Sequence, residues 1–230
     1  MSEFHFKKIK YPQMVFSSLF AIAFLMFFIL LSMSGCGAKK KAPEESVELD
    51  PGQLRVADWH ALMREKRDAP EMEKLESVNS FFNKLVFVDD LYHWGKKDYW
   101  ATPREMLVSN GGDCEDFATA KYFTLRNLEI PDEKMRLIYV KSLTLKQPHM
   151  VLSYYQEPTM EPLVLDSLVD EILIASKRPD LIPIYSFNGQ GYWLVRKQSS
   201  ERLGGSDNLS LWQELRQRFS QEAIAAPIPE

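Results

Sequence analysis

One cysteine lies where a thiol could act as a nucleophile. Cys114 directly follows Gly111, Gly112 and Asp113 and begins a stretch with helical periodicity. Glycine allows a sharp turn, and a helix N-terminus presents unpaired N–H groups and positive potential. That setting lowers the pKa of a thiol, and the same N–H groups stabilise an oxyanion. A cysteine that opens a buried helix is also an ordinary small core residue, so Cys114 needs partners before it predicts catalysis.

Two further residues supply the partners that thiol catalysis requires. His149 begins a predicted strand 35 residues after Cys114, and Asp166 ends the next strand 17 residues later. Alone, each has an ordinary explanation as a surface histidine or as the charge where a strand leaves the core. Together they offer a base for the thiol proton and an acid to orient that base. Adjacent antiparallel strands in a suitable register would place His149 beside Asp166, which predicts a Cys-His-Asp triad.

The elements that must position these residues come as helices first and strands afterwards. Capping residues and apolar periodicity predict helices over Asp58–Arg67, from Pro70 through Val86, from Thr102 to Asn110 and over Cys114–Leu128. Short β-rich runs follow at Met135–Lys141, His149–Tyr155, Pro162–Asp166, Ile184–Phe187 and Tyr192–Arg196. A last helix carries an apolar stripe of Leu211, Trp212, Leu215 and Phe219, which we expect to pack on the body; docking a partner is the alternative. This order predicts an α+β domain.

Composition excludes several other classes of protein. The 230 residues are 45% hydrophobic and 26% charged, which argues against wholesale disorder. A net charge of −4 argues against nucleic-acid binding through a basic surface. Two cysteines, Cys36 and Cys114, cannot build a disulfide framework or a four-thiolate zinc site. The four histidines form no HExxH motif, which excludes a zincin.

Residues 1–36 have the organisation of an export signal. Three lysines among the first ten residues precede an apolar run, Met14–Met33, and small residues follow. Met33-Ser34-Gly35-Cys36 resembles a bacterial lipobox, in which the thiol of Cys36 is acylated and becomes the new N-terminus. An uncleaved anchor is the alternative, because about 20 apolar residues span a bilayer core of about 30 Å. Both interpretations place the remainder outside the cytoplasm, tethered to a membrane.

The chain is therefore predicted to have four parts. They are a lipoprotein signal peptide or membrane anchor (1–36), a flexible tether rich in Lys, Glu, Pro and Gly (37–57), one folded domain (58–222) and a tail (223–230).

The candidate triad lies inside three longer motifs. They are Gly111-Gly112-Asp113-Cys114-Glu115-Asp116-Phe117-Ala118, His149-Met150-Val151-Leu152 and Leu163-Val164-Leu165-Asp166. In this order they resemble the bacterial transglutaminase-like cysteine proteinases, and the resemblance covers roughly residues 58–220. It implies a papain/transglutaminase-like core in which the nucleophile, at a helix N-terminus, packs on an antiparallel sheet. It also implies that Cys114 is the nucleophile, that His149 is general base and acid, and that Asp166 orients His149.

The resemblance further implies a substrate, a metal and a partner. Well-understood members are periplasmic proteases that cut the N-terminal region of large surface adhesins and so disperse biofilms. They bind calcium through acids flanking the nucleophile, here Asp113 and Glu115. Calcium takes six to eight oxygens, so other donors must complete the shell; Asp116, or Asp89 and Asp90, are candidates that the sequence does not fix. The ordinary explanation of Asp113, Glu115 and Asp116 is helix capping and attraction to the helix dipole. A structural role for calcium is expected, since thiolate chemistry needs no Lewis acid.

The implied partner is an inner-membrane receptor that senses cyclic di-GMP. Gly37 follows Cys36 where an Asp often retains lipoproteins at the inner membrane, so a periplasmic location on the outer membrane is weakly favoured.

Two other functions stay open. A transglutaminase or amidase acting on protein or cell-wall amides could use the same triad, with an amine in place of water. A non-catalytic periplasmic binding module is the second, although the complete Cys, His and Asp set argues against it.

Overall fold

The computed structural model describes residues 50–196 and 199–225, all within one compact unit. The predicted signal segment 1–36, including Cys36, lies outside the described residues, as does the tether up to residue 49. Among the helices of the described ranges, none combines the length and the apolar character needed to cross a membrane.

The first helix begins inside the segment predicted as a tether. Helix α2 (Pro51–Lys66) has Asp50 as its N-cap, and the Asp50 carboxylate accepts hydrogen bonds from the backbone N–H groups of Gly52 and Gln53 at 2.8 and 3.0 Å. The Gln53 side chain accepts in return from the Asp50 backbone N–H, which completes a capping box. The prediction of a flexible tether to residue 57 is therefore wrong for residues 51–57, because this cap starts the helix early. Helix α3 (Glu71–Phe82) follows Pro70, as predicted, but ends at Phe82 instead of continuing to Val86.

The segment before the candidate nucleophile is irregular and held by short elements. Helix α4 (Asp90–His93) is followed by α5 (Pro103–Ser109), whose capping box joins Thr102 and Glu105. Strand β1 (Val86–Phe87) pairs in parallel with β2 (Gly111–Gly112), a pairing that the sequence did not predict. This pairing fixes the backbone just before α6 (Cys114–Asn127), the helix that Cys114 opens.

The remaining strands of the described residues form one antiparallel sheet in the order β6-β5-β4-β3-β7-β8-β9. Their bounds are β3 (Met135–Ser142), β4 (Gln147–Tyr154), β5 (Leu163–Leu165), β6 (Leu173–Ile174), β7 (Leu181–Phe187), β8 (Tyr192–Arg196) and β9 (Ser199–Gly204). The five predicted strands are present within a few residues. The sequence missed β6, which is two residues long, and β9, whose polar residues show no alternation.

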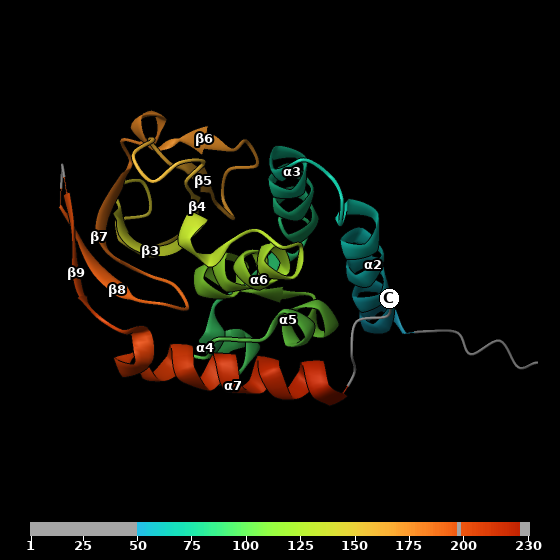
Figure 1. Ribbon diagram of the computed structural model, residues 1–230. Helices are drawn as coiled ribbons and strands as arrows, with labels where there is room; N and C mark the ends of the chain where they lie inside the picture. Colours follow the sequence, from blue (N-terminus) through green and yellow to red (C-terminus); the bar gives the residue numbers. More distant parts are fainter. Residues whose placement is uncertain (1–49, 197–198, 226–230) are drawn as a thin grey trace, which may run out of the picture. The chain divides into compact units, whose positions relative to one another are not determined.

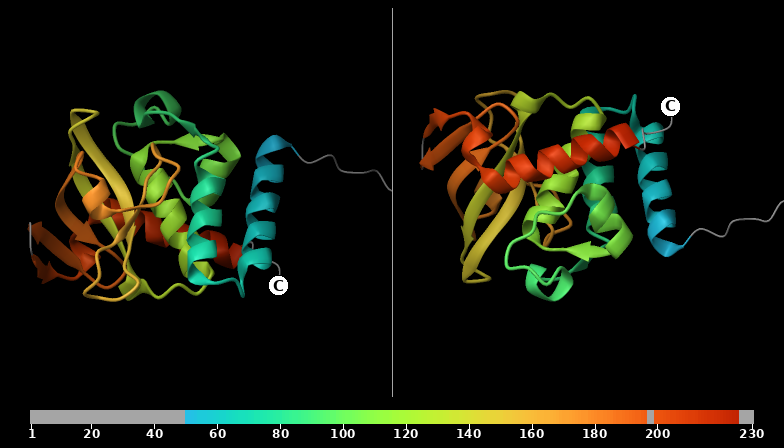
Figure 2. Two further views of the ribbon diagram at one scale, coloured as in Figure 1. Left: turned by 90° about the horizontal axis from the view of Figure 1, so that it is seen from above. Right: turned by 90° about the horizontal axis from the view of Figure 1, so that it is seen from below.

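Helix α6 occupies the centre, with the sheet on one side and α3 and α2 on the other (Figure 1). Helix α7 (Ser210–Ala225) crosses beneath α6, from the sheet towards α2 (Figure 2). The Trp212 side chain at its start is fully buried, stacks on Phe123 at 5.4 Å between ring centroids and meets Phe187 edge-on at 5.3 Å. The apolar stripe of α7 therefore packs on the body, as expected, and the helix continues past residue 222 into the predicted tail. The architecture is α+β.

Candidate active site

Cys114 is the first residue of α6 and lies half-buried in a cleft of about 400 Å³. His149, Trp100, Tyr139, Tyr185 and Leu211 also line this cleft. The two preceding glycines are required by close contacts. A Cβ on Gly111 would lie 2.6 Å from the Val86 carbonyl oxygen of β1, and one on Gly112 would overlap the Asp116 carboxylate. The turn that delivers the thiol therefore depends on these two residues having no side chain.

His149 and Asp166 come together as the strand pattern suggested. Strand β4 pairs antiparallel with β5 in the register Leu152↔Leu165, and Asp166 is the residue after β5. Its Oδ1 lies 2.8 Å from Nε2 of His149, and both side chains are 1% exposed. Solvent therefore does not compete for this hydrogen bond.

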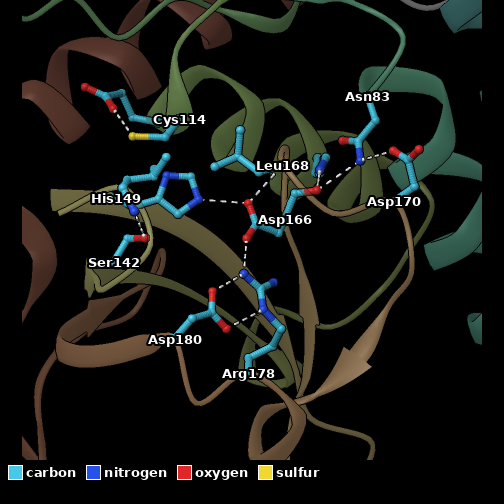
Figure 3. A network of polar contacts seen from close by, with 12 residues as sticks. Asn83, Cys114, Ser142, His149, Asp166, Leu168, Asp170, Arg178 and Asp180 are labelled. Atoms are coloured by element: carbon cyan, nitrogen blue, oxygen red, sulfur yellow. Dashed lines mark hydrogen bonds and ion pairs between the residues drawn. The ribbon is translucent and has the colours of Figure 1, made fainter. Parts of the chain in front are cut away.

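The three predicted triad residues form a row in which the imidazole lies between the sulfur and the carboxylate (Figure 3). Because Nε2 of His149 bonds Asp166, Nδ1 is the ring nitrogen left for the thiol. The backbone N–H of Met150, the next residue after His149, donates to the Cys114 sulfur, which ties α6 to β4 at this point. The arrangement suits proton transfer from sulfur to imidazole.

The electrostatics of the thiol differ from the expectation. Burial raises the pKa of Cys114, and the charge of Glu115, its hydrogen bond to the sulfur at 2.9 Å and the charge of Asp113 raise it further. The helix N-terminus alone predicted a lowered pKa. In this arrangement burial and the surrounding carboxylates outweigh that effect.

These carboxylates belong to a group that we call the acid cluster: Asp90, Asp98, Asp113, Glu115 and Asp116. Subsets of them bring their ligand atoms within 4.8 Å of one another. Backbone groups hold part of the cluster in place. Asp116 accepts from the N–H of Ala101 at 2.6 Å and of Asp113 at 3.2 Å, while Asp90 accepts from the N–H of Tyr99.

The acid cluster fits a calcium ion by two observations. Within the described part of the chain, Oδ1 of Asp90 and Oδ1 of Asp113 are buried without a hydrogen-bond partner. Burial, together with neighbouring acids, raises the pKa of Asp90 to about 6 and that of Asp113 to about 10. Buried carboxylates need a positive charge nearby to remain ionised. Calcium would provide that charge, and carboxylate oxygens are the ligands that it prefers.

The cluster also refines the predicted set of donors. Asp113 and Glu115 lie in it, as do Asp90 and Asp116, which were considered as additional donors. Asp89 lines the cleft but is not among the grouped acids. Asp98 was missed, because it is a single acid in an irregular segment and no sequence pattern distinguishes it.

The side chains around the triad acid form a second group, which lies behind His149. We call it the Asp166 group: Asp166, Arg178, Asp180, Lys121 and Asn83. Nη2 of Arg178 donates to Oδ2 of Asp166 at 2.7 Å, and Lys121 and Asn83 donate to the Asp166 backbone carbonyl at 3.1 and 3.0 Å (Figure 3). Burial alone would raise the pKa of Asp166, but the His149 and Arg178 interactions outweigh it and lower that pKa to about 2.

Apart from Asp166 itself, no sequence pattern pointed directly to the members of this group. Lys121 had one weak signal, since it lies seven residues after Cys114 and therefore on the same face of α6. Burial lowers its pKa to about 7. Arg178 lies in the irregular stretch before β7 and carries no pattern that could have identified it.

Comparisons with known proteins agree with the geometry. A family model described as bacterial transglutaminase-like cysteine proteinase BTLCP matches residues 56–202. The chain is similar to the solved structure of EGTA-treated Legionella pneumophila LapG, with 45% identity over 75% of this chain and 91% of that one and a TM-score of 0.69. It is also similar to Legionella pneumophila LapG without a stated treatment and in a calcium-bound form. Both have 44% identity to this chain and a TM-score of 0.67. The first match covers 75% of this chain and 91% of that one. The match to the calcium-bound form covers 74% of this chain and 92% of that one. No curated protein matches the chain significantly.

Proposed function

The chain belongs to the bacterial transglutaminase-like cysteine proteinases and is a cysteine protease, and we propose that it cuts the N-terminal region of a large surface adhesin through the triad Cys114, His149 and Asp166. The observation that carries the triad is the 2.8 Å hydrogen bond between buried His149 and Asp166, directly behind a cysteine at a helix N-terminus. The adhesin is proposed from the family resemblance, and cutting it would control attachment in a biofilm.

The proposed reaction uses the two nitrogens of His149 for different tasks. Nδ1 takes the proton from the Cys114 thiol as the sulfur attacks the amide carbonyl, and the first backbone N–H groups of α6 stabilise the oxyanion. His149 then protonates the leaving amine and afterwards activates the water that hydrolyses the thioester. Asp166 stays ionised throughout and holds the Nε2–H of His149.

We further propose that the acid cluster binds calcium through Asp90, Asp98, Asp113 and Glu115. The unpartnered buried oxygens of Asp90 and Asp113 support this, as do the calcium-bound and EGTA-treated forms in which the related LapG is known. A bound Ca²⁺ supplies positive charge beside carboxylates that otherwise disfavour the Cys114 thiolate. Asp116 contributes by shaping the loop, since both of its oxygens already accept backbone hydrogen bonds.

The cellular setting is proposed from the sequence. The protease is tethered to a membrane in the periplasm, either through acylated Cys36 or through residues 14–33, and the outer membrane is weakly favoured. Its proposed regulator is an inner-membrane receptor that senses cyclic di-GMP. Labelling with a radioactive fatty acid tests the lipid: Cys36→Ala should abolish incorporation, and continued incorporation would contradict acylation at this residue.

Proteolysis by the triad is tested on candidate adhesin fragments. The chain from residue 37 is incubated with N-terminal adhesin fragments, with calcium or with chelator, beside Cys114→Ala. We expect new peptide termini that depend on both the thiol and calcium, detected by mass spectrometry. A loss of ammonia without chain cleavage would instead identify amide transfer. Full biological activity of Cys114→Ala would identify a binding module.

A further inference from the structure

The Asp166 carboxylate is held on both of its oxygens by different elements. Oδ1 accepts from Nε2 of His149 at 2.8 Å and from the backbone N–H of Leu168 at 3.1 Å, whereas Oδ2 accepts from Arg178 at 2.7 Å. Rotation of the carboxylate would therefore break contacts on both oxygens. Among the three side chains His149, Asp166 and Arg178, the first two are 1% exposed and Arg178 is 7% exposed, so water is a poor replacement for any of them.

Arg178 is itself fixed by a second carboxylate, that of Asp180. Its Nε donates to Oδ1 of Asp180 at 3.0 Å, and its Nη2 donates to Oδ2 of Asp180 at 2.9 Å (Figure 3). A bidentate contact of this kind sets the plane of the guanidinium as well as its distance. The backbone at Arg178 is also anchored, since its N–H donates to Ala175 and its carbonyl accepts from the N–H of Leu181.

Stability alone does not account for this arrangement. A buried ion pair adds little net stability, because removing both charges from water costs about as much as their attraction returns. Its distinctive effect is geometric: Asp180 fixes the guanidinium of Arg178, and Nη2 of Arg178 then holds Oδ2 of Asp166, which restricts the orientation of that carboxylate. That orientation directs Oδ1 at Nε2 of His149 and leaves Nδ1 for Cys114.

We propose that Arg178 is a positioning residue for catalysis: it holds the Asp166 carboxylate in the orientation that keeps His149 as the Nε2–H tautomer facing Cys114. This rests on the proposed function, because it assigns Arg178 a part in the same proteolytic site. Arg178 touches neither the substrate nor the reacting atoms and acts through Asp166. Asp180 is not part of the triad, but it keeps the guanidinium of Arg178 in the position from which Arg178 bonds Asp166.

Kinetics on a cleavable adhesin fragment provide the first test, with the full chain carrying Arg178→Gln or Arg178→Lys. We expect Arg178→Gln to lower kcat on the order of 100-fold, the scale of a small misplacement of a catalytic group, with KM nearly unchanged. Arg178→Lys keeps the charge but not the fork and should recover part of kcat. The matched control is Arg126→Gln, which removes another arginine with a part-buried hydrogen bond, one that donates to the Ile130 carbonyl at the opposite end of α6 from Cys114. It should leave kcat of the folded protein near the wild-type value.

The tautomer of His149 provides a readout that loss of stability would not change. The chain has four histidines, so long-range ¹⁵N–¹H spectra resolve the ring nitrogens. Wild type and Arg126→Gln should show one His149 tautomer with the proton on Nε2, and Arg178→Gln should show a mixture. If Arg178→Gln does not fold, the same comparison uses Arg178→Lys.

Two results would overturn the inference. They are a kcat of wild-type size in the folded Arg178 variants, and an unchanged His149 tautomer in those variants. Either result with Cys114→Ala inactive would remove the role of Arg178 and leave the protease intact. Activity of Cys114→Ala would instead remove the proposed function itself.

Discussion

The acid cluster and the Asp166 group are both built from buried carboxylates, but their charges are balanced differently. The acid cluster brings five acids to the start of α6 and includes buried oxygens without a partner among the described residues. The Asp166 group contains its own cations, and Arg178 pairs with both Asp166 and Asp180. The pKa values of the two groups differ accordingly: the pKa of Asp113 is raised to about 10, whereas that of Asp166 is lowered to about 2.

The two groups therefore contribute to catalysis in different ways. The Asp166 group is complete within the polypeptide, so the orientation of His149 needs nothing from outside. In the function proposed above, the acid cluster is completed by calcium, and it surrounds the sulfur whose ionisation the reaction requires. On that proposal, folding fixes the orientation of the base, whereas the ionisation of the nucleophile depends on a bound ligand.

The largest expected effect comes from removing the charge of the triad acid. Asp166→Asn should lower kcat roughly 10³- to 10⁴-fold, because an amide can stabilise the wrong tautomer of the base. The measurement is kcat on the adhesin fragment, with circular dichroism to establish folding and Asp170→Asn as a control of the same chemistry nearby. A loss of less than about tenfold in folded Asp166→Asn would contradict its place in the triad.

Chelation should affect the acid cluster and leave the Asp166 group unchanged. Calcium at about 100 times its dissociation constant stabilises the folded state by about 2.7 kcal/mol, and EGTA should remove this. Melting curves with and without EGTA measure the shift in Tm, which Asp113→Asn should abolish.

Asp180→Asn is the control for that experiment, because it alters the Asp166 group and should keep the full calcium response. Equal Tm values with calcium and with EGTA in the wild type would argue that the cluster binds no calcium.

Acid should remove the stability that the Asp166 group provides. The pKa of Asp166 is about 2 in the folded protein against an ordinary value of 3.8, so the stabilisation is complete above about pH 4 and is lost as the pH falls towards 2. The loss amounts to about 2 kcal/mol. Urea unfolding at several pH values should show the stability difference between wild type and Asp166→Asn shrinking over this window; a constant difference would contradict the lowered pKa.

The smallest effect is expected at the outer end of the Asp166 group. Asp180→Asn keeps an acceptor for Arg178 but loses a charge, and its side chain is 30% exposed. We expect a cost below about 1 kcal/mol and a reduction of kcat by only a few-fold. Parallel assays with Asp166→Asn measure the ratio of the two effects, and equal losses would mean that Asp180 matters as much as the triad acid.

The sequence predicted those features that depend on local patterns. Thr102 with Pro103 indicated a helix start, and the short β-rich runs located β3, β4 and β5 closely enough to place His149 beside Asp166. The motifs around Cys114 also led to the correct family. These predictions succeed because capping and strand patterns act within a few residues.

Features that depend on distant contacts were not predicted. Asp98 and Arg178 are single charges in irregular segments, and only the folded chain brings them to Asp90 and Asp166. The raised pKa of Cys114 has the same origin, since the helix N-terminus is visible in the sequence but the burial of the surrounding acids is not. The early start of α2 was a different error, because the cap formed by Asp50 and Gln53 is local and was overlooked.

The position of α7 has a consequence for how the enzyme is made. Arg218 of α7 donates to the Tyr99 hydroxyl and to the Trp100 carbonyl, and Thr102 donates to Glu222 at 2.7 Å, so the last helix holds the segment that carries one wall of the cleft. A ribosome adds this helix after every other helix and strand of the described residues. A nascent chain therefore carries its cysteine, histidine and aspartate well before that wall is secured, and the cleft is complete only once α7 has been made.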